Sequence, residues 1–134
     1  MNHYLVISGT SGIGQSLINQ LSAKGHYVHF TSRTNLTAAL EPNTGFTQLD
    51  PTDFSAMVGL FESLTAQFGK IDGVVNCSGS LLLKPAHLTS INDYNNVILA
   101  NLTTAFAVVH AAGKTMTKEG GSVVLMSSAA AQVG

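Results

Sequence analysis

The sequence predicts an α/β fold in which a parallel sheet is covered by helices on both faces. Short apolar runs alternate with longer amphipathic segments, as in repeated strand–helix–strand units. The first run, Tyr4–Ile7, leads into a glycine-rich turn ending at Gly14 and then into a helical pattern. The chain is 45% apolar and 10% charged, against about 25% charged residues in an average soluble domain. Both features favour strands buried on two faces.

The first part of the chain predicts three strands and a helix. The helix is expected over residues 12–24, with Gly25 as its left-handed C-terminal cap, and its buried stripe is expected to be Ile13, Leu17 and Leu21. The second and third strands are expected at Tyr27–Phe30 and Phe46–Leu49. Between them, residues 36–40 predict a short helix or turn.

The second long helix has the clearest period. Its apolar residues recur at spacings of three and four, at Phe54, Met57, Phe61, Leu64 and Phe68. Thr52 is the expected N-cap and Gly69 the expected end. We interpret this stripe as core.

A fourth strand, a long helix and a fifth strand complete the pattern. The fourth strand is expected at Gly73–Val75 and the fifth at Val123–Met126. The helix is expected from about Ser90 to Gly113, with a buried face of Ile91, Tyr94, Ile98, Leu102, Ala105, Val109 and Ala112.

These elements predict one doubly wound parallel sheet with strand order 3-2-1-4-5. The fifth strand is a continuous apolar run, which is typical of an interior strand, yet nothing after it could pair with it. We therefore expect residues 1–134 to be a single dinucleotide-binding domain that is truncated at its C-terminus. The natural protein should continue with at least one more helix and strand.

Polar and glycine clusters follow every predicted strand. Because the carboxyl ends of parallel strands share one edge, these clusters should meet in a ligand crevice. Strand-to-helix turns often use such residues, but that alone does not explain an arginine or paired serines. The clusters are Ser8–Gly14, Ser32-Arg33, Asp50, Asn76–Gly79 and Ser127-Ser128.

The first cluster suits a dinucleotide. Gly9, Gly12 and Gly14 would let the backbone approach a pyrophosphate at a helix N-terminus. An NAD site places an acidic residue about twenty positions later, but the first acid after these glycines is Glu41. Arg33, next to Ser32, could instead bind the 2′-phosphate of NADP. We therefore predict NADP rather than NAD.

Two further polar residues have open interpretations. Asp50 could accept a hydrogen bond from adenine or could cap the following helix. Asn101 lies inside the long helix, where asparagine is unfavourable, and is as consistent with a functional role as with a solvated one.

The bulk properties exclude several classes of function. A net charge of −1 gives no basis for binding nucleic acid or an anionic membrane. The single cysteine, Cys77, permits no intrachain disulfide and reads as a small buried residue, which fits a cytoplasmic protein. The five histidines lack metal-ligand spacing. We expect no signal peptide and no membrane span.

Five features of the sequence, taken in chain order, resemble the short-chain dehydrogenase/reductase family and its Rossmann-type fold over essentially the whole chain. They are the turn Ser11-Gly12-Ile13-Gly14, the pair Leu49-Asp50, the stretch Asn76-Cys77-Ser78-Gly79, Asn101, and Ser127-Ser128. The resemblance implies that residues 12–14 cradle the pyrophosphate and that Asp50 meets the adenine. It also implies that residues 76–79 stabilise the sheet beside the cofactor, that Asn101 holds a water in a proton relay, and that Ser128, rather than Ser127, binds the substrate oxygen.

Two departures from the family pattern stand out. Ser8 occupies the place of the family's first glycine, so either Ser8 adopts that tight turn or Gly9 serves in a shorter loop. The family's acid/base motif, Tyr-x-x-x-Lys, does not occur, because the residues four positions after the three tyrosines are Ser8, Thr31 and Ile98.

The resemblance implies an NADP(H)-dependent oxidoreductase that acts on a small carbonyl or alcohol substrate, with this chain inactive alone. It also implies a homodimer or homotetramer of the intact protein, associating through the long helix. The alternative is a non-catalytic NAD(P)-binding sensor or scaffold. A flavodoxin-type mononucleotide domain is a weaker alternative, since it gives no reason for Asp50, Asn101 and Ser128 to occur together.

Overall fold

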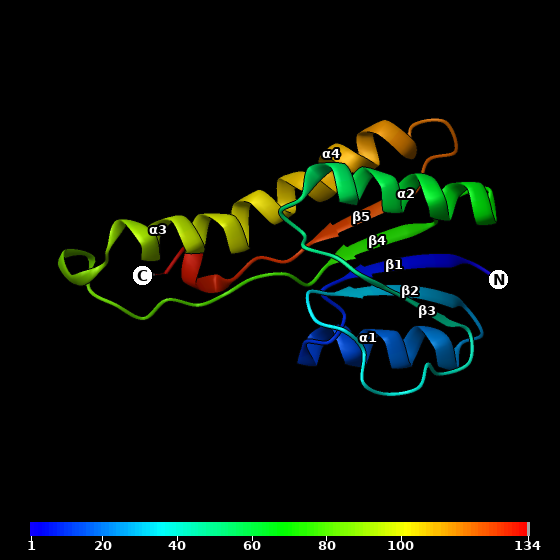
Figure 1. Cartoon of the computed structure of the whole chain (residues 1–134), viewed down its shortest axis with the longest axis horizontal. Coiled ribbons are helices and arrows are strands. Elements are labelled where there is room, and N and C mark those ends of the chain that lie inside the picture. The colour runs from blue at the N-terminus through cyan, green and yellow to red at the C-terminus, as the bar shows by residue number, and fades with distance from the viewer. Residues whose placement is uncertain (134) are drawn as a thin grey trace.

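The computed structural model describes residues 1–133 and places five parallel strands in one sheet, in the order β3-β2-β1-β4-β5 (Figure 1). Val6, on the central strand, lies opposite Phe30 on one side and Val75 on the other. The predicted fold class and strand order are confirmed. The strands are β1 (His3–Ile7), β2 (Tyr27–Ser32), β3 (Thr44–Gln48), β4 (Gly73–Asn76) and β5 (Ser122–Leu125).

Helices cover the two faces of this sheet unequally. Helix α1 (Gly12–Ala23) lies on one face, and α2 (Phe54–Phe68) and α4 (Thr104–Thr115) lie on the other (Figure 1). Helix α3 (Ile91–Ile98) and the π-helical turn η2 (Leu99–Thr103) precede α4 and form an arm that projects from the body. Single 3₁₀ turns occur at η1 (Ala86–Leu88) and η3 (Ala129–Ala131).

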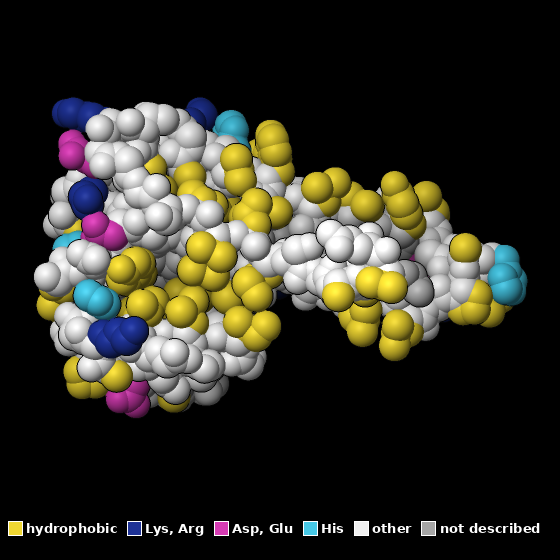
Figure 2. All heavy atoms as spheres, turned by 180° about the vertical axis from the view of Figure 1, so that it is seen from behind, with side chains coloured by type: hydrophobic (Ala, Val, Ile, Leu, Met, Phe, Trp, Pro, Cys, Tyr) yellow, Lys and Arg dark blue, Asp and Glu magenta, His cyan; other side chains and the backbone are white. Residues whose placement is uncertain are grey.

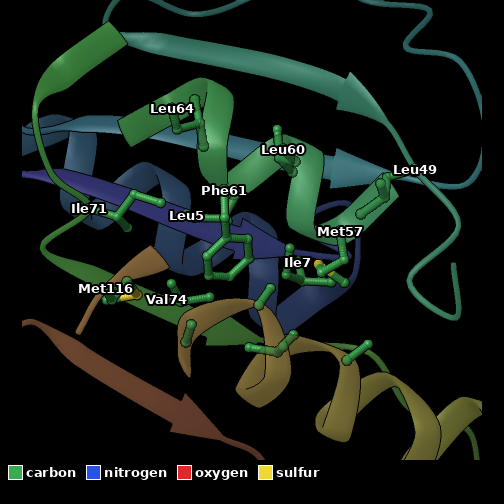
Figure 3. Close-up of a cluster of buried hydrophobic side chains, with 14 residues drawn as sticks. Leu5, Ile7, Leu49, Met57, Leu60, Phe61, Leu64, Ile71, Val74 and Met116 are labelled. Atoms are coloured by element: carbon green, nitrogen blue, oxygen red, sulfur yellow. The ribbon is translucent and has the colours of Figure 1, made fainter. Parts of the chain in front are cut away.

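The core divides into two clusters because alternate strand residues point to opposite faces. The larger cluster joins β1 and β4 to α2 and α4 around Phe61, which is fully buried against Leu5 and Val74 (Figure 3). The smaller cluster lies under α1 and consists of Val6, Ile18, Val28 and Phe30. The predicted α2 stripe is confirmed, and Gly69 ends that helix with φ +85°.

Two local predictions before α2 are wrong. Residues 36–40 form neither the expected helix nor the expected turn: Ala38 is a bend and the other four residues are irregular, because five residues before Pro42 are too few to sustain a helix. The N-cap of α2 is Asp53 rather than Thr52: Asp53 accepts a hydrogen bond from the Ala56 N–H at 3.0 Å. Thr52 is already held by Asp50, which accepts from its N–H and its hydroxyl at 2.9 and 2.8 Å.

The predicted buried faces of two other helices are also wrong in part. In α1 the buried residues are Gly14 and Ile18, whereas Ile13 is 61% exposed. The long helix ends at Thr115 rather than Gly113 and turns small residues inward, since these let it pack closely on α2. They are Thr104, Ala107, Val108, Ala111 and Ala112.

Most of the large residues assigned to the buried face of the long helix lie on its outer side instead. Ile91, Tyr94, Leu102 and Val109 are exposed, and so is Phe106 beside them. Figure 2 shows apolar side chains along the projecting arm and across the middle of the body. Length and composition alone would let residues 91–115 cross a membrane, but the inward face packs as a core helix does. The length and composition of this helix are therefore only weak support for a membrane span.

Strand β5 forms one edge of the sheet, and its side chains are exposed along its length. Val124 and Leu125 are 48% and 45% exposed. An apolar edge strand presents unpaired backbone groups and favours association. The exposed edge expected from the sequence is therefore present in residues 1–133.

Candidate functional site

The turn after β1 is built around Ser8, which adopts a left-handed backbone with φ +59°. Its N–H donates to the hydroxyl of Thr31 on β2 at 3.0 Å, and the N–H of Gly9 donates to the Thr31 carbonyl at 2.9 Å. Of the two alternatives for this turn, the structure shows the first: Ser8 adopts the turn itself.

The three predicted glycines have different surroundings. A Cβ on Gly9 would lie 2.7 Å from Cβ of Phe30, and a Cβ on Gly14 would lie 2.7 Å from Cα of Gly9. These two glycines therefore let α1 pack against β1 and β2. A Cβ on Gly12 would meet nothing within 4 Å. Gly12 thus leaves open space at the N-terminus of α1, where a ligand could approach the backbone.

Ser11 caps α1, because its hydroxyl accepts a hydrogen bond from the Gly14 N–H at 3.1 Å. The first N–H groups of a helix have no partner inside the helix and carry its positive dipole end. Such an end attracts phosphate groups. The turn can therefore bind the diphosphate of a nucleotide.

A cavity of about 440 Å³ opens at the carboxyl ends of β1, β2 and β4. The structure brings seven of the predicted residues together there: Ser8, Ser11, Ser32, Arg33, Cys77, Ser78 and Gly79. Asp50 lines an adjoining cavity of about 430 Å³, which shares Arg33, Ser80 and Ala100 with the first. Gly12 and Ile13 instead line an apolar groove of about 580 Å³ between α1 and the uncovered face of β4 and β5.

Just after β2, Arg33 lies beside Asp50, and both line the second cavity. Its Nη2 atom lies 3.8 Å from Oδ1 of Asp50, and both side chains are 59% exposed. The pKa of Asp50 is lowered, chiefly by the hydrogen bond from the Thr52 N–H, then by the Thr52 hydroxyl, and to a smaller extent by Arg33. Asp50 is thus held as an anion. It accepts from Thr52 through Oδ1, and its adenine contact stays a prediction.

The turn after β4 continues the floor of the cavity. Asn76 is buried, and its Oδ1 atom accepts a hydrogen bond from the Ser78 N–H at 3.1 Å. The N–H of Cys77 donates to the Ile7 carbonyl at 2.9 Å, which ties this turn to β1. Burial raises the pKa of the Cys77 thiol. Cys77 is therefore a protonated, half-buried residue that also lines the cavity.

Asn101 lies in the π-helical turn η2 and holds the segment that follows Gly79. Its Oδ1 atom accepts from the Ser80 N–H at 3.1 Å, and its Nδ2 atom donates to the Ser80 carbonyl at 3.0 Å. Nδ2 also donates to the Val97 carbonyl at 3.0 Å. A π-helical turn is rare and often marks a functional site. The structure therefore gives Asn101 a specific contact rather than a merely solvated position.

The structure does not bring Ser128 to the cavities. It is exposed, and its hydroxyl accepts from the Ala130 N–H at 3.2 Å to start η3. Within residues 1–133 the structure shows no hydrogen bond between Ser128 and Asn101. Its role in substrate binding stays a prediction.

Sequence reasoning missed several residues that line the cavity or hold its turns. Thr31 forms the two contacts to the Ser8–Gly9 turn, and Ser80 is the partner of Asn101. Thr10, Ala100 and Thr104 line the cavity as well. Thr31 ends an apolar strand, which could have indicated it, whereas Ser80 carries no sequence signal because its backbone makes the contacts.

Comparison with known proteins decides the family. A family model described as short chain dehydrogenase matches residues 2–134. The chain belongs to the short-chain dehydrogenase family. It is 30% identical to a D-threitol dehydrogenase of Mycolicibacterium smegmatis, over 96% of this chain and 53% of that protein. It is 33% identical to an NADP-dependent 3-hydroxy acid dehydrogenase of Shigella flexneri, over 72% of this chain and 42% of that protein.

Solved structures agree with this assignment. The protein ElxO with NADP bound superimposes with a TM-score of 0.90 at 27% identity, over 99% of this chain and 58% of that one. A serine dehydrogenase of Escherichia coli gives 0.88 at 27% identity, over 98% and 64%. The chain thus spans about half the length of the curated relatives it matches. Within residues 1–133 no group of three or more potential ligands is placed to hold a metal.

Proposed function

We propose that the protein containing this chain is an NADP(H)-dependent oxidoreductase that transfers a hydride between the nicotinamide and a carbonyl or alcohol carbon. The single observation that carries this is the cavity at the carboxyl edge of the sheet. Ser8 and Ser11, from the turn that leads into α1, line this cavity together with Ser32 and Arg33 at the end of β2, and Gly12 leaves open space next to Ser11 at the helix N-terminus. This arrangement fits a long anionic ligand such as a dinucleotide.

The preference for NADP rests on the end of β2. An Arg33 guanidinium there can form charge-assisted hydrogen bonds with a 2′-phosphate, and the sequence has no acid between Gly14 and Glu41 that would repel it. Two similar proteins support the proposal: one is named as an NADP-dependent dehydrogenase, and the solved structure of the other holds NADP.

In this proposal each cavity residue has a role toward the dinucleotide. The backbone of residues 11–14 binds the diphosphate, Ser32 and Arg33 bind the 2′-phosphate, Asp50 meets the adenine, and residues 76–79 form the floor. When bound, the nicotinamide supplies or accepts the hydride. Ser128 hydrogen-bonds the substrate oxygen, and Asn101 positions Ser80 and holds a water for proton transfer.

We also propose that residues 1–134 are part of a larger domain and are inactive alone. The edge position of the apolar strand β5 supports this, and so does the match to only about half of each relative. The general acid/base would lie outside residues 1–134, which contain no Tyr-x-x-x-Lys. The second candidate is a non-catalytic NAD(P)-binding sensor or scaffold. A cytoplasmic location and the lack of nucleic-acid and membrane partners stay predictions.

The outer stripe of the long helix supports an oligomer. Ile91, Tyr94, Leu102, Phe106 and Val109 recur at helical spacing and are exposed. A continuous apolar stripe of this kind is buried when two helices pair. We propose that two copies associate through it as a homodimer, or as part of a homotetramer.

The experiment that separates the two candidates uses the full-length protein. It is incubated with NADPH and a panel of small ketones and aldehydes, and the loss of reduced nicotinamide absorbance is followed. An oxidoreductase consumes NADPH with at least one carbonyl compound, and an Arg33→Ala control does so less efficiently. NADPH binding without consumption across the panel supports the sensor, whereas failure to bind NADPH contradicts both.

A further inference from the structure

The hydroxyls of Ser8 and Ser78 lie 2.7 Å apart and form a hydrogen-bonded pair. Ser8 comes from the turn after β1 and Ser78 from the turn after β4, so the pair joins two turns separated by 70 positions in the chain. Both residues are half-buried and line the 440 Å³ cavity. The pair is therefore a fixed part of the cavity floor.

Hydrogen bonds hold the backbones of both serines in place. The backbone of Ser8 is held at φ +59° by its N–H bond to the Thr31 hydroxyl, although this region disfavours residues with a Cβ. The backbone of Ser78 is held by its N–H bond to Oδ1 of Asn76 at 3.1 Å. A serine that accepts an unfavourable backbone conformation within a binding cavity points to a use for its side chain.

The pair leaves one hydroxyl proton without a partner. Two hydroxyls carry two protons, and one of these forms the bond between them. In the part of the chain that the structure describes, neither hydroxyl has another hydrogen-bond partner. The second proton is therefore available to a ligand in the cavity, and the first bond orients it.

We propose that the Ser8–Ser78 pair donates a hydrogen bond to a ribose or diphosphate oxygen of the bound dinucleotide, which rests on the proposed function of this cavity. The acceptor belongs to the part that NADPH and NADH share. We infer this from where the pair lies: it joins the turns after β1 and β4, whereas Ser32 and Arg33, the predicted ligands of the 2′-phosphate, lie at the end of β2. The pair acts as one unit, since each serine orients the other.

A double-mutant cycle on the full-length protein tests this. Dissociation constants for NADPH and NADH are measured for the wild type, Ser8→Gly, Ser78→Ala and the double variant. Each single change should weaken both cofactors about fivefold, the size of one hydrogen bond. The double variant should bind no more weakly than the weaker single variant. Ser8→Gly should retain its thermal midpoint, because glycine accepts the left-handed turn.

Three outcomes would overturn the inference: affinities within twofold of the wild type, losses confined to NADPH, or losses that add in the double variant. Ser55→Ala, an exposed serine on α2, is the matched control and should bind both cofactors as the wild type does. If the wild type binds neither cofactor, the proposed function fails instead, so the two failures are distinguishable.

Discussion

The Asn101 side chain forms two hydrogen bonds with the backbone of Ser80: it accepts from the Ser80 N–H at 3.1 Å and donates to the Ser80 carbonyl at 3.0 Å. This contact ties the π-helical turn to the segment after β4 that borders both cavities. The side chain thus connects the arm with the floor of the site.

Asn101→Ala should destabilise the protein by about 1–2 kcal/mol, because it removes three exposed hydrogen bonds, two to the Ser80 backbone and one to the Val97 carbonyl, each worth about 0.5 kcal/mol. Urea denaturation measures this loss, and hydrogen exchange should quicken at Ser80. Asn95→Ala, at an exposed position in the preceding helix α3, is the control. Unchanged exchange at Ser80 would show that the contact does not hold the segment.

Gly12 and Gly14 should respond oppositely to alanine. Gly14→Ala places a Cβ 2.7 Å from the Gly9 backbone and should cost about 1–3 kcal/mol of folding stability. Gly12→Ala meets no protein atom within 4 Å. It should leave stability unchanged or raised while weakening NADPH binding about tenfold or more, because the methyl group occupies the open space. The account of this turn is wrong if Gly12→Ala binds NADPH normally.

Acid should destabilise the fold through His29, whose ring bonds the Tyr27 hydroxyl at 3.2 Å and the Thr47 hydroxyl at 2.8 Å. Burial lowers the pKa of His29 from 6.5 to about 4. The unfolded chain therefore binds the proton more readily, so this stability is complete above pH 6.5 and is lost as the pH falls toward 4.

Between these values the free energy of unfolding should fall by up to about 1.4 kcal/mol per pH unit from this one group. Denaturant titrations at several pH values measure the slope, and His29→Gln should make it shallower. His87→Gln, an exposed histidine on η1, should not. Equal slopes in all three proteins would exclude His29 as the source.

The helix stripe should control assembly. Leu102→Glu places a charge at a position that is 62% exposed in one copy but buried in the proposed pair. We expect sedimentation to show dissociation of the full-length oligomer with the fold retained. Lys118→Glu, which lies in the turn beyond α4, should leave assembly unchanged. A wild type that sediments as a monomer would contradict the proposed interface.

Strand order and the carboxyl-edge site could be predicted because apolar runs and chain connectivity restrict a parallel sheet to few arrangements. The orientation of the long helix could not. Its large residues and its small ones both repeat at helical spacing, and close packing on α2 selects the small set, including Ala107 and Ala111. The Ser8–Ser78 bond could not be predicted either, because it joins two turns distant in sequence.

The most direct test of the central claim is the affinity of the full-length protein for NADPH and NADH, before and after Arg33→Ala. Fluorescence titration should show NADPH bound at least about tenfold more tightly than NADH, since a charge-assisted contact contributes about 1.5–3 kcal/mol. Arg33→Ala should remove most of that preference and leave NADH unaffected. Equal affinities in the wild type, or a preference that survives Arg33→Ala, would contradict the account.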